Sequence, residues 1–224
     1  MNRGAKRLAG WVGAGVLVSA LAVPGCGVPS REHETVHGGE ERSWHLYVPP
    51  GLPADRAVPL VVVLHGGGGN GRQLERFLEF DALADREGFL VVYPDGLDRG
   101  WNDGRGSGSV ESQRAGVDDA GFLIAMIDEI AARHRVDPDR VYVTGISNGG
   151  FMSHALANRF PSRIAAIAPI VGGMAPAVAA GFGSGAVAVL ILQGTDDPLV
   201  PYSGGTVARD RGACIDTVAA AKLW

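Results

Sequence analysis

The stretch VTGISNGGFM, residues 143–152, places a serine between a β-rich run and a helical one. A strand that turns this sharply into a helix forces its turn residue, Ser147, into a strained backbone conformation. Small neighbours are needed because the strand and the helix pass close together, and Gly145 and Gly149 supply that space. The pattern therefore predicts that the serine side chain projects from the carboxyl end of a sheet. The alternative is a simple helix cap, since Ser147 and Asn148 both belong to residue types that favour that position.

Apolar runs and helical stretches alternate along the chain. The run PLVVVLH, residues 59–65, is continuous and is followed by glycines, a pattern typical of a strand buried on both faces of a parallel sheet. Residues 98–116 are rich in glycine and serine, and we expect them to form a long surface loop. The other elements are expected in this order: strand 43–50, helix 73–87, strand 89–96, helix 117–135, strand 137–145, helix 148–160, strands 163–172 and 186–193, and helix 216–224. These spacings predict an α/β fold, with a mostly parallel sheet and helices on both of its faces.

The N-terminal segment is expected to be separate from the folded domain. Three basic residues precede an uncharged, mostly apolar run, which is typical of a bacterial export signal over residues 1–25. A transmembrane anchor is the alternative, but the run is shorter than the roughly 18 apolar residues that a span requires. The letters AVPGC resemble a lipoprotein cleavage box, so Cys26 is a candidate for lipidation, with cleavage without lipidation as the other reading. Residues 26–42 are expected to form a flexible tether, followed by one domain at 43–224. We therefore expect a protein outside the cell or in the cell envelope, with a lipid anchor as one option.

The charge and the cysteines limit the partners and cofactors. The formal net charge is −4 and the pI is about 5.8, and basic residues cluster only in the first seven positions, which argues against nucleic acid as a partner. Cysteine and histidine do not occur at zinc-ligand spacing, so no metal site is expected. Of the two cysteines, Cys214 has no partner if Cys26 carries a lipid. The sequence does not fix the oligomeric state.

A glycine-rich loop follows the first continuous apolar run. In LHGGGG, residues 64–69, the glycines leave backbone amides open to a ligand and permit the turn that this requires. We expect Gly67, with Gly68 as the alternative, to donate one amide to an oxyanion. Asn148 is expected to donate the other from the start of its helix. A phosphate-binding loop is excluded because the lysine that such loops carry is missing.

Two adjacent aspartates follow the last predicted strand, in LQGTDDPLVPY. Asp197 is predicted to orient an imidazole and to stabilise its positive form, whereas Asp196 is expected to cap the loop. The alternative is that both aspartates only form the turn before Pro198.

Residues 43–205 resemble an esterase family of the α/β-hydrolase fold that includes polyhydroxybutyrate depolymerases and feruloyl and acetylxylan esterases. Five motifs carry the resemblance, in the order LHGGGGN, WND, VDDAGFLIAMID, VTGISNGGFMSHALA and LQGTDDPLVPYSGG. It implies secreted hydrolysis of small-molecule or polymeric carboxylic esters through an acyl-serine intermediate, without a cofactor. Ser147 would be the nucleophile and Asp197 the acid, and the order of serine before acid agrees with this fold. Trp101 and Phe151 are candidates to line the substrate pocket, although core packing is the commoner role for such residues.

The family pattern also implies a histidine after the acid, because a serine hydroxyl needs a base at neutral pH. Each of the six histidines precedes Asp197: His33, His37, His45, His65, His134 and His154. We therefore expect the last strand and helix of the fold, with their histidine loop, to be missing from this sequence. His154 and His65 are poor substitutes, since His154 is expected to point back along its helix and His65 to hold the glycine loop. Two hypotheses follow: a serine esterase impaired by truncation, or a non-catalytic surface lipoprotein that binds ester-like ligands.

Overall fold

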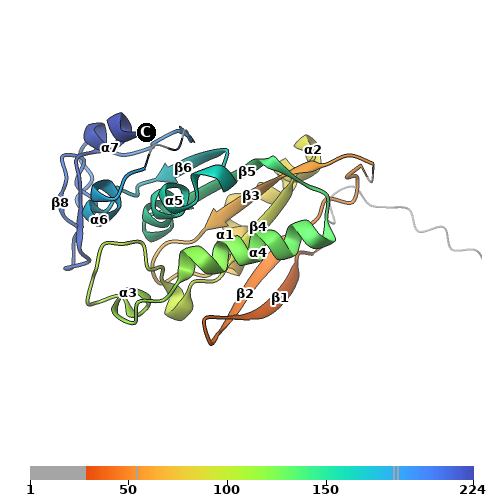
Figure 1. The fold of residues 1–224 in the computed structure, drawn as a ribbon, viewed down its shortest axis with the longest axis horizontal. Coiled ribbons are helices and arrows are strands. Elements are labelled where there is room, and N and C mark those ends of the chain that lie inside the picture. The colour runs from red at the N-terminus through yellow and green to blue at the C-terminus, as the bar shows by residue number, and fades with distance from the viewer. Residues whose placement is uncertain (1–28, 54, 184, 186) are drawn as a thin grey trace, which may run out of the picture.

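The computed structural model describes residues 29–53, 55–183, 185 and 187–224 (Figure 1). The predicted export signal and Cys26 lie outside the described residues. Among the helices that the structure describes, none has the length and hydropathy of a membrane span.

A seven-stranded sheet in the order β1-β2-β4-β3-β5-β6-β7 forms the centre of the molecule (Figure 1). Its strands are β1 (Arg31–His37), β2 (Glu40–Tyr47), β3 (Val58–Leu64), β4 (Leu90–Pro94), β5 (Val136–Ile146), β6 (Ala166–Ile170) and β7 (Ala188–Val189). The β1–β2 and β2–β4 pairs are antiparallel, and the other neighbouring pairs are parallel. The predicted mostly parallel sheet is confirmed. A separate two-stranded ribbon, β8 (Gly205–Thr206) with β9 (Ala213–Cys214), follows near the C-terminus.

Helices pack on both faces of this sheet, as predicted. The helices are α1 (Gly71–Leu78), α2 (Phe80–Glu87), α3 (Glu111–Arg114), α4 (Asp119–Arg133), α5 (Asn148–Arg159), α6 (Pro176–Ala180) and α7 (Thr217–Leu223), with short 3-10 turns η1 (Leu97–Arg99) and η2 (Pro161–Arg163). Side chains alternate along β3, so that Val62 and Leu64 join the buried cluster under α4 and α5, whereas Val63 joins the one under α1 and α2. Both faces of the strand are apolar because both are covered.

The stretch predicted as one helix, residues 73–87, is two helices. Glu79 has a left-handed backbone, with φ 52° and ψ 25°, and it ends α1 and begins α2. The apolar residues of this stretch are only roughly at helical spacing, and Phe77 is 76% exposed. The break turns the second half of the stretch back onto the sheet, where Ala84 is buried.

The predicted tether at residues 26–42 is wrong from residue 31 onward. Residues 31–37 form β1, which pairs with β2 in a hairpin, from Arg31 opposite Leu46 to His37 opposite Glu40. The two residues between the strands are Gly38 and Gly39, with φ 63° and 87°, as a tight hairpin turn requires. The segment is polar because β1 is an edge strand with one solvated face, and polarity alone does not indicate a tether. The domain therefore begins about twelve residues earlier than predicted.

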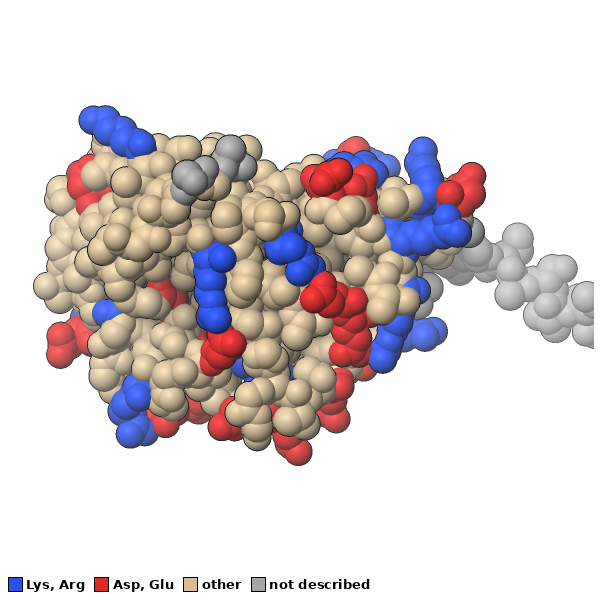
Figure 2. Space-filling model, in the orientation of Figure 1, with Lys and Arg blue, Asp and Glu red and all other residues tan. Residues whose placement is uncertain are grey.

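Acidic and basic side chains are mixed on the surface. On the face shown in Figure 2, they lie interspersed over the described part of the chain and do not gather by sign.

Candidate active site

The chain turns from β5 into α5 at Ser147, which has φ 53° and ψ −117°. Such a backbone conformation in a non-glycine residue is unfavourable by roughly 1–3 kcal/mol, so the surrounding structure has to hold it. The Ser147 amide donates to the carbonyl of Ile170 at 2.9 Å, and its side chain makes no capping hydrogen bond to α5 in the described structure. The predicted strained turn is confirmed, and the helix-cap alternative is wrong for Ser147.

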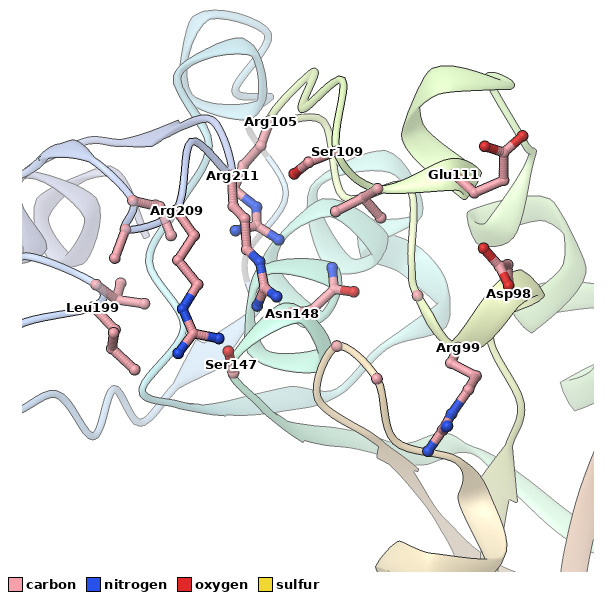
Figure 3. Close-up of a pocket in the computed structure, with 17 residues that line it drawn as sticks. Asp98, Arg99, Arg105, Ser109, Glu111, Ser147, Asn148, Leu199, Arg209 and Arg211 are labelled. Atoms are coloured by element: carbon pink, nitrogen blue, oxygen red, sulfur yellow. The ribbon is translucent and has the colours of Figure 1, made fainter.

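A cavity of about 200 Å³ opens beside Ser147 (Figure 3). It lies at the carboxyl ends of the parallel strands, where open α/β sheets bind their ligands. Loops that are distant in sequence enclose it, and the residues that line it are Gly67, Gly68, Asp98, Arg99, Gly100, Arg105, Ser109, Val110, Glu111, Ser147, Asn148, Leu199, Val200, Val207, Ala208, Arg209 and Arg211. No histidine is among these lining residues. The structure thus brings the predicted nucleophile together with both predicted amide donors, but not with an imidazole.

Two glycines of the loop after β3, Gly67 and Gly68, line this cavity and differ in the use of their amides. The amide of Gly68 donates to the Arg99 carbonyl at 2.8 Å, so it is already used. Neither Gly67 nor Asn148 uses its amide in a hydrogen bond to another described residue. This geometry favours Gly67 over Gly68 as the donor that accompanies Asn148. The role of the two amides in catalysis stays a prediction.

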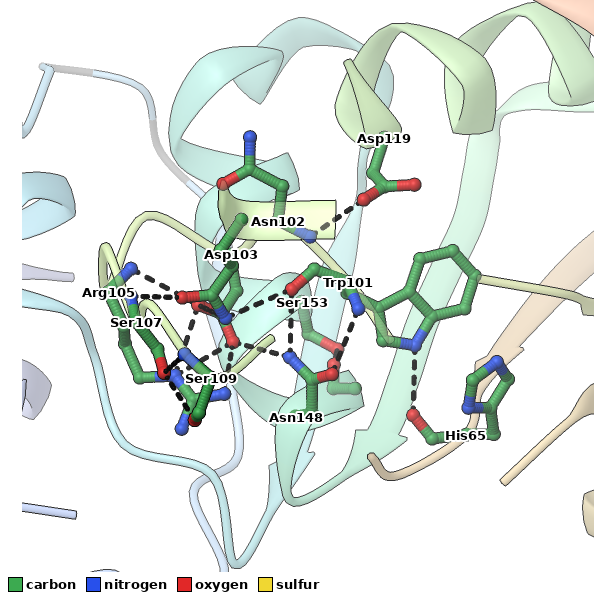
Figure 4. Close-up of polar contacts among 12 residues, drawn as sticks. His65, Trp101, Asn102, Asp103, Arg105, Ser107, Ser109, Asp119, Asn148 and Ser153 are labelled. Atoms are coloured by element: carbon green, nitrogen blue, oxygen red, sulfur yellow. Dashed lines mark hydrogen bonds and ion pairs between the residues drawn. The ribbon is translucent and has the colours of Figure 1, made fainter. Parts of the chain in front are cut away.

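The loop at 98–116 is only in part the surface loop that its composition predicts, because it combines exposed and buried residues. Six of its residues are buried: Gly100, Trp101, Asp103, Ser107, Ser112 and Gln113. Its polar groups bond to one another and to α5, which explains how so polar a sequence packs against the site (Figure 4). The loop is anchored from the other side by Asp119 on α4, which accepts from the Asn102 amide at 2.7 Å and pairs with the buried Arg42 at 2.7 Å.

Asp103 is the centre of this buried network (Figure 4). Its carboxylate pairs with Arg105 at 2.7 Å and accepts from the side-chain amides of Asn148 at 2.6 Å and Gln113 at 3.0 Å. Burial raises the pKa of the Asp103 carboxyl, and the contacts with Arg105 and Asn148 lower it. The Asn148 side chain is held at its other end as well, because its Oδ1 accepts from the Trp101 amide at 2.9 Å. Asp103 thereby fixes Asn148, which lines the cavity beside Ser147.

The predictions that Trp101 and Phe151 line the substrate pocket are wrong. Both side chains are fully buried, and neither is among the lining residues. The Trp101 indole donates to the His65 carbonyl at 2.9 Å, which ties the 98–116 loop to the glycine loop. Phe151 packs in a small cluster with Val200, Val207 and Cys214. Both aromatic side chains pack beneath the residues that line the cavity, which agrees with the core-packing role considered above.

Asp197 lies in the turn after the last part of the sheet. Its Oδ1 accepts from the amides of Leu199 at 2.8 Å and Val200 at 2.9 Å, and its Oδ2 accepts from Gln193 at 3.3 Å. Asp197 therefore caps the loop, the role expected for Asp196, and Asp196 is exposed. The turn-forming alternative holds for Asp197. Its role as catalytic acid stays a prediction, because no histidine among the described residues contacts it.

His65 serves to hold the glycine loop. Its Nδ1 lies 2.8 Å from the Gly66 carbonyl, and its Nε2 accepts from the Gly96 amide at 2.9 Å. Burial lowers the pKa of His65, so the ring stays neutral, with Nδ1 as donor and Nε2 as acceptor. Both nitrogens are occupied, and His65 is not available as a base.

His154 is a core residue of α5. It is fully buried, its ring stacks on Trp224, and its Nδ1 accepts from the Trp224 indole at 3.0 Å. Burial lowers the pKa of His154 from 6.5 to about 4. His154 is thus in the core, and neither His154 nor His65 lines the cavity beside Ser147.

The buried His154 is expected to make the stability fall in mild acid. The pKa of His154 is lower in the folded chain than in the unfolded chain. Between pH 6.5 and about 4, His154 is therefore protonated in the unfolded chain and neutral in the folded one. The contribution of His154 to the free energy of unfolding should fall by about 3 kcal/mol as the pH is lowered through this window, and stay constant below it. Denaturant titrations at several pH values check this, with His154→Gln, which should show a shallower dependence. An identical pH dependence in the two proteins would contradict the assignment.

The sequence did not predict the roles of Asp103 and of the arginines that line the cavity. Asp103 stands in the motif WND, and the motif alone did not reveal its contact with Asn148. The arginines of the cavity lie in loops without periodicity, so no pattern placed them beside Ser147. They are Arg99, Arg105, Arg209 and Arg211.

Comparison with known sequences gives one family and several relatives. The family model described as "Esterase PHB depolymerase" matches residues 42–199. The protein NocK of Nocardia uniformis subsp. tsuyamanensis is 36% identical over 177 residues, which cover 78% of this chain and 51% of NocK. Poly(3-hydroxyalkanoate) depolymerase C of Paucimonas lemoignei is 38% identical over 129 residues, 57% of this chain and 30% of that protein. Feruloyl esterase C of Emericella nidulans is 28% identical over 199 residues, 86% of this chain and 68% of that protein. The chain thus spans about half the length of NocK and less than a third of the depolymerase.

Solved structures show the same fold. The structure named sOPH superposes with a TM-score of 0.61 at 19% identity and covers 90% of this chain and 77% of its own. A thermostable esterase gives a TM-score of 0.59 at 22% identity, over 78% of this chain and 49% of its own. An acetyl xylan esterase from Aspergillus awamori gives 0.53 at 20% identity, over 69% of this chain and 55% of its own. The predicted α/β-hydrolase fold is confirmed, while the predicted lack of a final strand and helix stays a prediction.

Proposed function

Because this chain belongs to the esterase PHB depolymerase family, we propose that it is a serine hydrolase of carboxylic esters with Ser147 as the nucleophile. One observation carries the proposal: Ser147 sits in a strained turn at the edge of a cavity that it shares with Gly67 and Asn148. Strain of this kind persists where the surrounding structure enforces it, and it is typical of functional residues. We propose that the backbone amides of Gly67 and Asn148 stabilise the developing oxyanion, which is supported by their place in the lining of the same cavity.

The reaction would proceed in two steps. The Ser147 hydroxyl oxygen adds to the ester carbonyl and loses its proton to a base, and the amides of Gly67 and Asn148 stabilise the oxyanion. The tetrahedral intermediate expels the alcohol, which takes up a proton, and leaves an acyl-serine. Water then hydrolyses this ester and regenerates the serine. Each oxyanion donor contributes on the order of 3 kcal/mol to the transition state.

Within the described part of the chain, no side chain is in place to act as the base of this mechanism. We propose that an imidazole oriented by Asp197 supplies it, as the resemblance implies, and that His65 and His154 do not. Among the residues that the structure describes, the cavity contains no imidazole. The chain as given should therefore react with strongly activated reagents at Ser147 but turn ordinary esters over slowly.

The substrate and the location complete the proposal. The named activities of the relatives favour an ester of a hydroxyalkanoate, an aromatic acid or acetate, as a polymer or a small molecule. We propose that the protein acts outside the cell or on its envelope, with Cys26 as a candidate lipid anchor. No cofactor is required by this chemistry.

Covalent labelling tests the proposed nucleophile directly. An alkyl fluorophosphonate is expected to phosphonylate Ser147 in preference to other serines, because this hydroxyl lies in the strained turn at the cavity, beside the proposed donors Gly67 and Asn148. Mass spectrometry of the digested protein gives the site. Ser147→Ala should abolish the label, and Ser203→Ala, at an exposed serine outside the cavity, should leave it unchanged. Label that persists in Ser147→Ala would refute the assignment. No label in a folded chain would favour the non-catalytic, ligand-binding alternative.

A further inference from the structure

Four arginines line the cavity, and three of them carry charge that the fold does not neutralise. Arg105 is committed to the fold, because it pairs with Asp103 at 2.7 Å and its guanidinium lies over the Phe151 ring at 4.0 Å from the ring centre. The other three, Arg99, Arg209 and Arg211, form no ion pair with any residue that the structure describes.

The charge of the cavity is unevenly placed. Its two acidic lining residues are Asp98 and Glu111, and Glu111 already pairs with Arg114. Figure 3 shows these two acids on the opposite side of the cavity from Arg209 and Arg211, whose guanidinium groups reach toward the serine. The side of the cavity that faces the β8–β9 ribbon is therefore positive.

The loop that carries these two arginines is held in an unfavourable conformation. Arg209 and Asp210 both have left-handed backbones, with φ 62° and 54°. Two such residues are unfavourable by roughly 1 kcal/mol or more each, so other contacts must fix the loop. The Val207 amide donates to the Gly212 carbonyl at 2.8 Å, and the Ser107 hydroxyl donates to the Asp210 carbonyl at 3.3 Å. The loop is thus closed on itself and anchored to the 98–116 loop, which keeps its arginines over the cavity.

Arg211 also lies close to the predicted oxyanion loop. A methyl group added to the Cα of Gly67 would lie 3.9 Å from Nη1 of Arg211. A carbonyl bound at the Gly67 and Asn148 amides would therefore have this guanidinium within a few atoms of it. A guanidinium binds carboxylates through two parallel hydrogen bonds and is selective for that shape.

We propose that the ester that this site accepts bears a carboxylate a few atoms from its scissile carbonyl, and that Arg209 and Arg211 bind this carboxylate. The inference rests on the proposed function, because Ser147 defines where the scissile carbonyl lies. A neutral ester would displace water from the two guanidinium groups and give no charged partner in return. A carboxylate replaces that water with charge-assisted hydrogen bonds.

A pair of non-hydrolysable probes of the same shape tests the proposal. Calorimetric titration of the full chain would compare 4-acetamidobenzoate, which is anionic, with 4-acetamidobenzamide, which is neutral. The carboxylate is expected to bind about tenfold more tightly or better, and about 0.5 M salt should weaken it selectively. Arg209→Gln and Arg211→Gln should each reduce this preference several-fold, and Arg209→Glu should remove it. Arg56→Gln is the matched control, because Arg56 is exposed and precedes β3 at the opposite end of the sheet.

The outcomes separate this inference from the proposed function. Equal affinities for the two probes, or no binding of either, would overturn the inference even if Ser147 takes the fluorophosphonate label. A carboxylate preference that depends on the two arginines would support the anion site, even if Ser147 stays unlabelled and the esterase proposal fails. A preference that survives both arginine substitutions would also overturn it, because the binding residues would then lie elsewhere.

Discussion

Replacing Asp103 with alanine is expected to lower the free energy of unfolding by about 3–5 kcal/mol. The Arg105 side chain is only 4% exposed, so removal of its partner leaves a buried charge without compensation. The change also removes one acceptor from each of the buried side-chain amides of Asn148 and Gln113, which keep only the Trp101 carbonyl. Denaturant unfolding of the two proteins at the same pH measures the difference.

A surface ion pair provides the control for this change. Asp137 pairs with Arg140 at 2.6 Å, but both side chains are partly exposed, and solvent and salt screen such pairs so that they contribute little to stability. Asp137→Ala should therefore lower the free energy of unfolding far less than Asp103→Ala. A similar loss of unfolding free energy in the two variants would show that burial does not explain the contribution of the Asp103–Arg105 pair to stability.

Asp103 should also affect the nucleophile without contacting it. Its bond to the Asn148 side chain fixes the first residue of α5, so loss of the carboxylate should loosen the backbone amide of Asn148, the proposed oxyanion donor. Under conditions where the variant is folded, fluorophosphonate labelling of Ser147 is expected to slow. Asp103→Asn keeps an oxygen acceptor for Asn148 and should recover part of the rate. Unchanged labelling in folded Asp103→Ala would limit Asp103 to a structural role.

The parts of the fold that the sequence predicts well are those that short-range rules determine. Buried parallel strands are continuous apolar runs, and the run before the glycine loop became β3 with both faces covered. The turn at Ser147 was predictable for a similar reason. A strand that reverses into a helix over so few residues restricts the backbone of the turn to one conformation. The close approach of strand and helix requires glycines on either side of the serine, and these glycines can be recognised in the sequence.

The parts that the sequence missed depend on partners distant along the chain. Residues 31–37 are polar on both sides of the pleat, and only pairing with β2 makes them a strand. The Gly38–Gly39 turn was the available signal, because two such residues between alternating segments favour a hairpin. Composition also failed to predict the buried part of residues 98–116. Carboxylate, amide and guanidinium groups form hydrogen bonds with one another there, and the amino-acid composition of a segment does not show such pairing.

The positions of single residues around the cavity also depend on contacts between distant parts of the chain. Asp197 and Asp196 are indistinguishable by type, and which of them caps the loop depends on which carboxylate meets the amides of Leu199 and Val200. The arginines on the β8–β9 loop reach Ser147 only because that loop folds back over the sheet, across more than sixty residues of sequence. Neither the capping role of Asp197 nor the position of these arginines produces a periodic pattern in the sequence.

Gly149→Ala is expected to destabilise the protein by about 3 kcal/mol or more and to abolish labelling of Ser147. An alanine methyl group at this position would lie 2.7 Å from the carbonyl oxygen of His65 and closer still to that of Leu64. Both atoms belong to the backbone at the end of β3, so no side-chain rotation relieves the clash, and α5 must move away from the sheet. That movement would carry the Asn148 amide away from Gly67 and open the oxyanion site. Thermal or denaturant unfolding, together with fluorophosphonate labelling, measures both effects.

Gly51→Ala is the matched control, because a methyl group there meets no atom within 4 Å and the backbone has no positive φ. It should change the free energy of unfolding by about 1 kcal/mol at most and leave labelling intact. Gly145→Ala should resemble Gly149→Ala, since its methyl group would lie 2.5 Å from the backbone of Gly149 itself. The strain at Ser147 is stable only while β5, β3 and α5 stay in this close contact. A stable Gly149→Ala protein that still takes the label would mean that the turn tolerates a wider spacing, and that close packing is not what holds the serine in place.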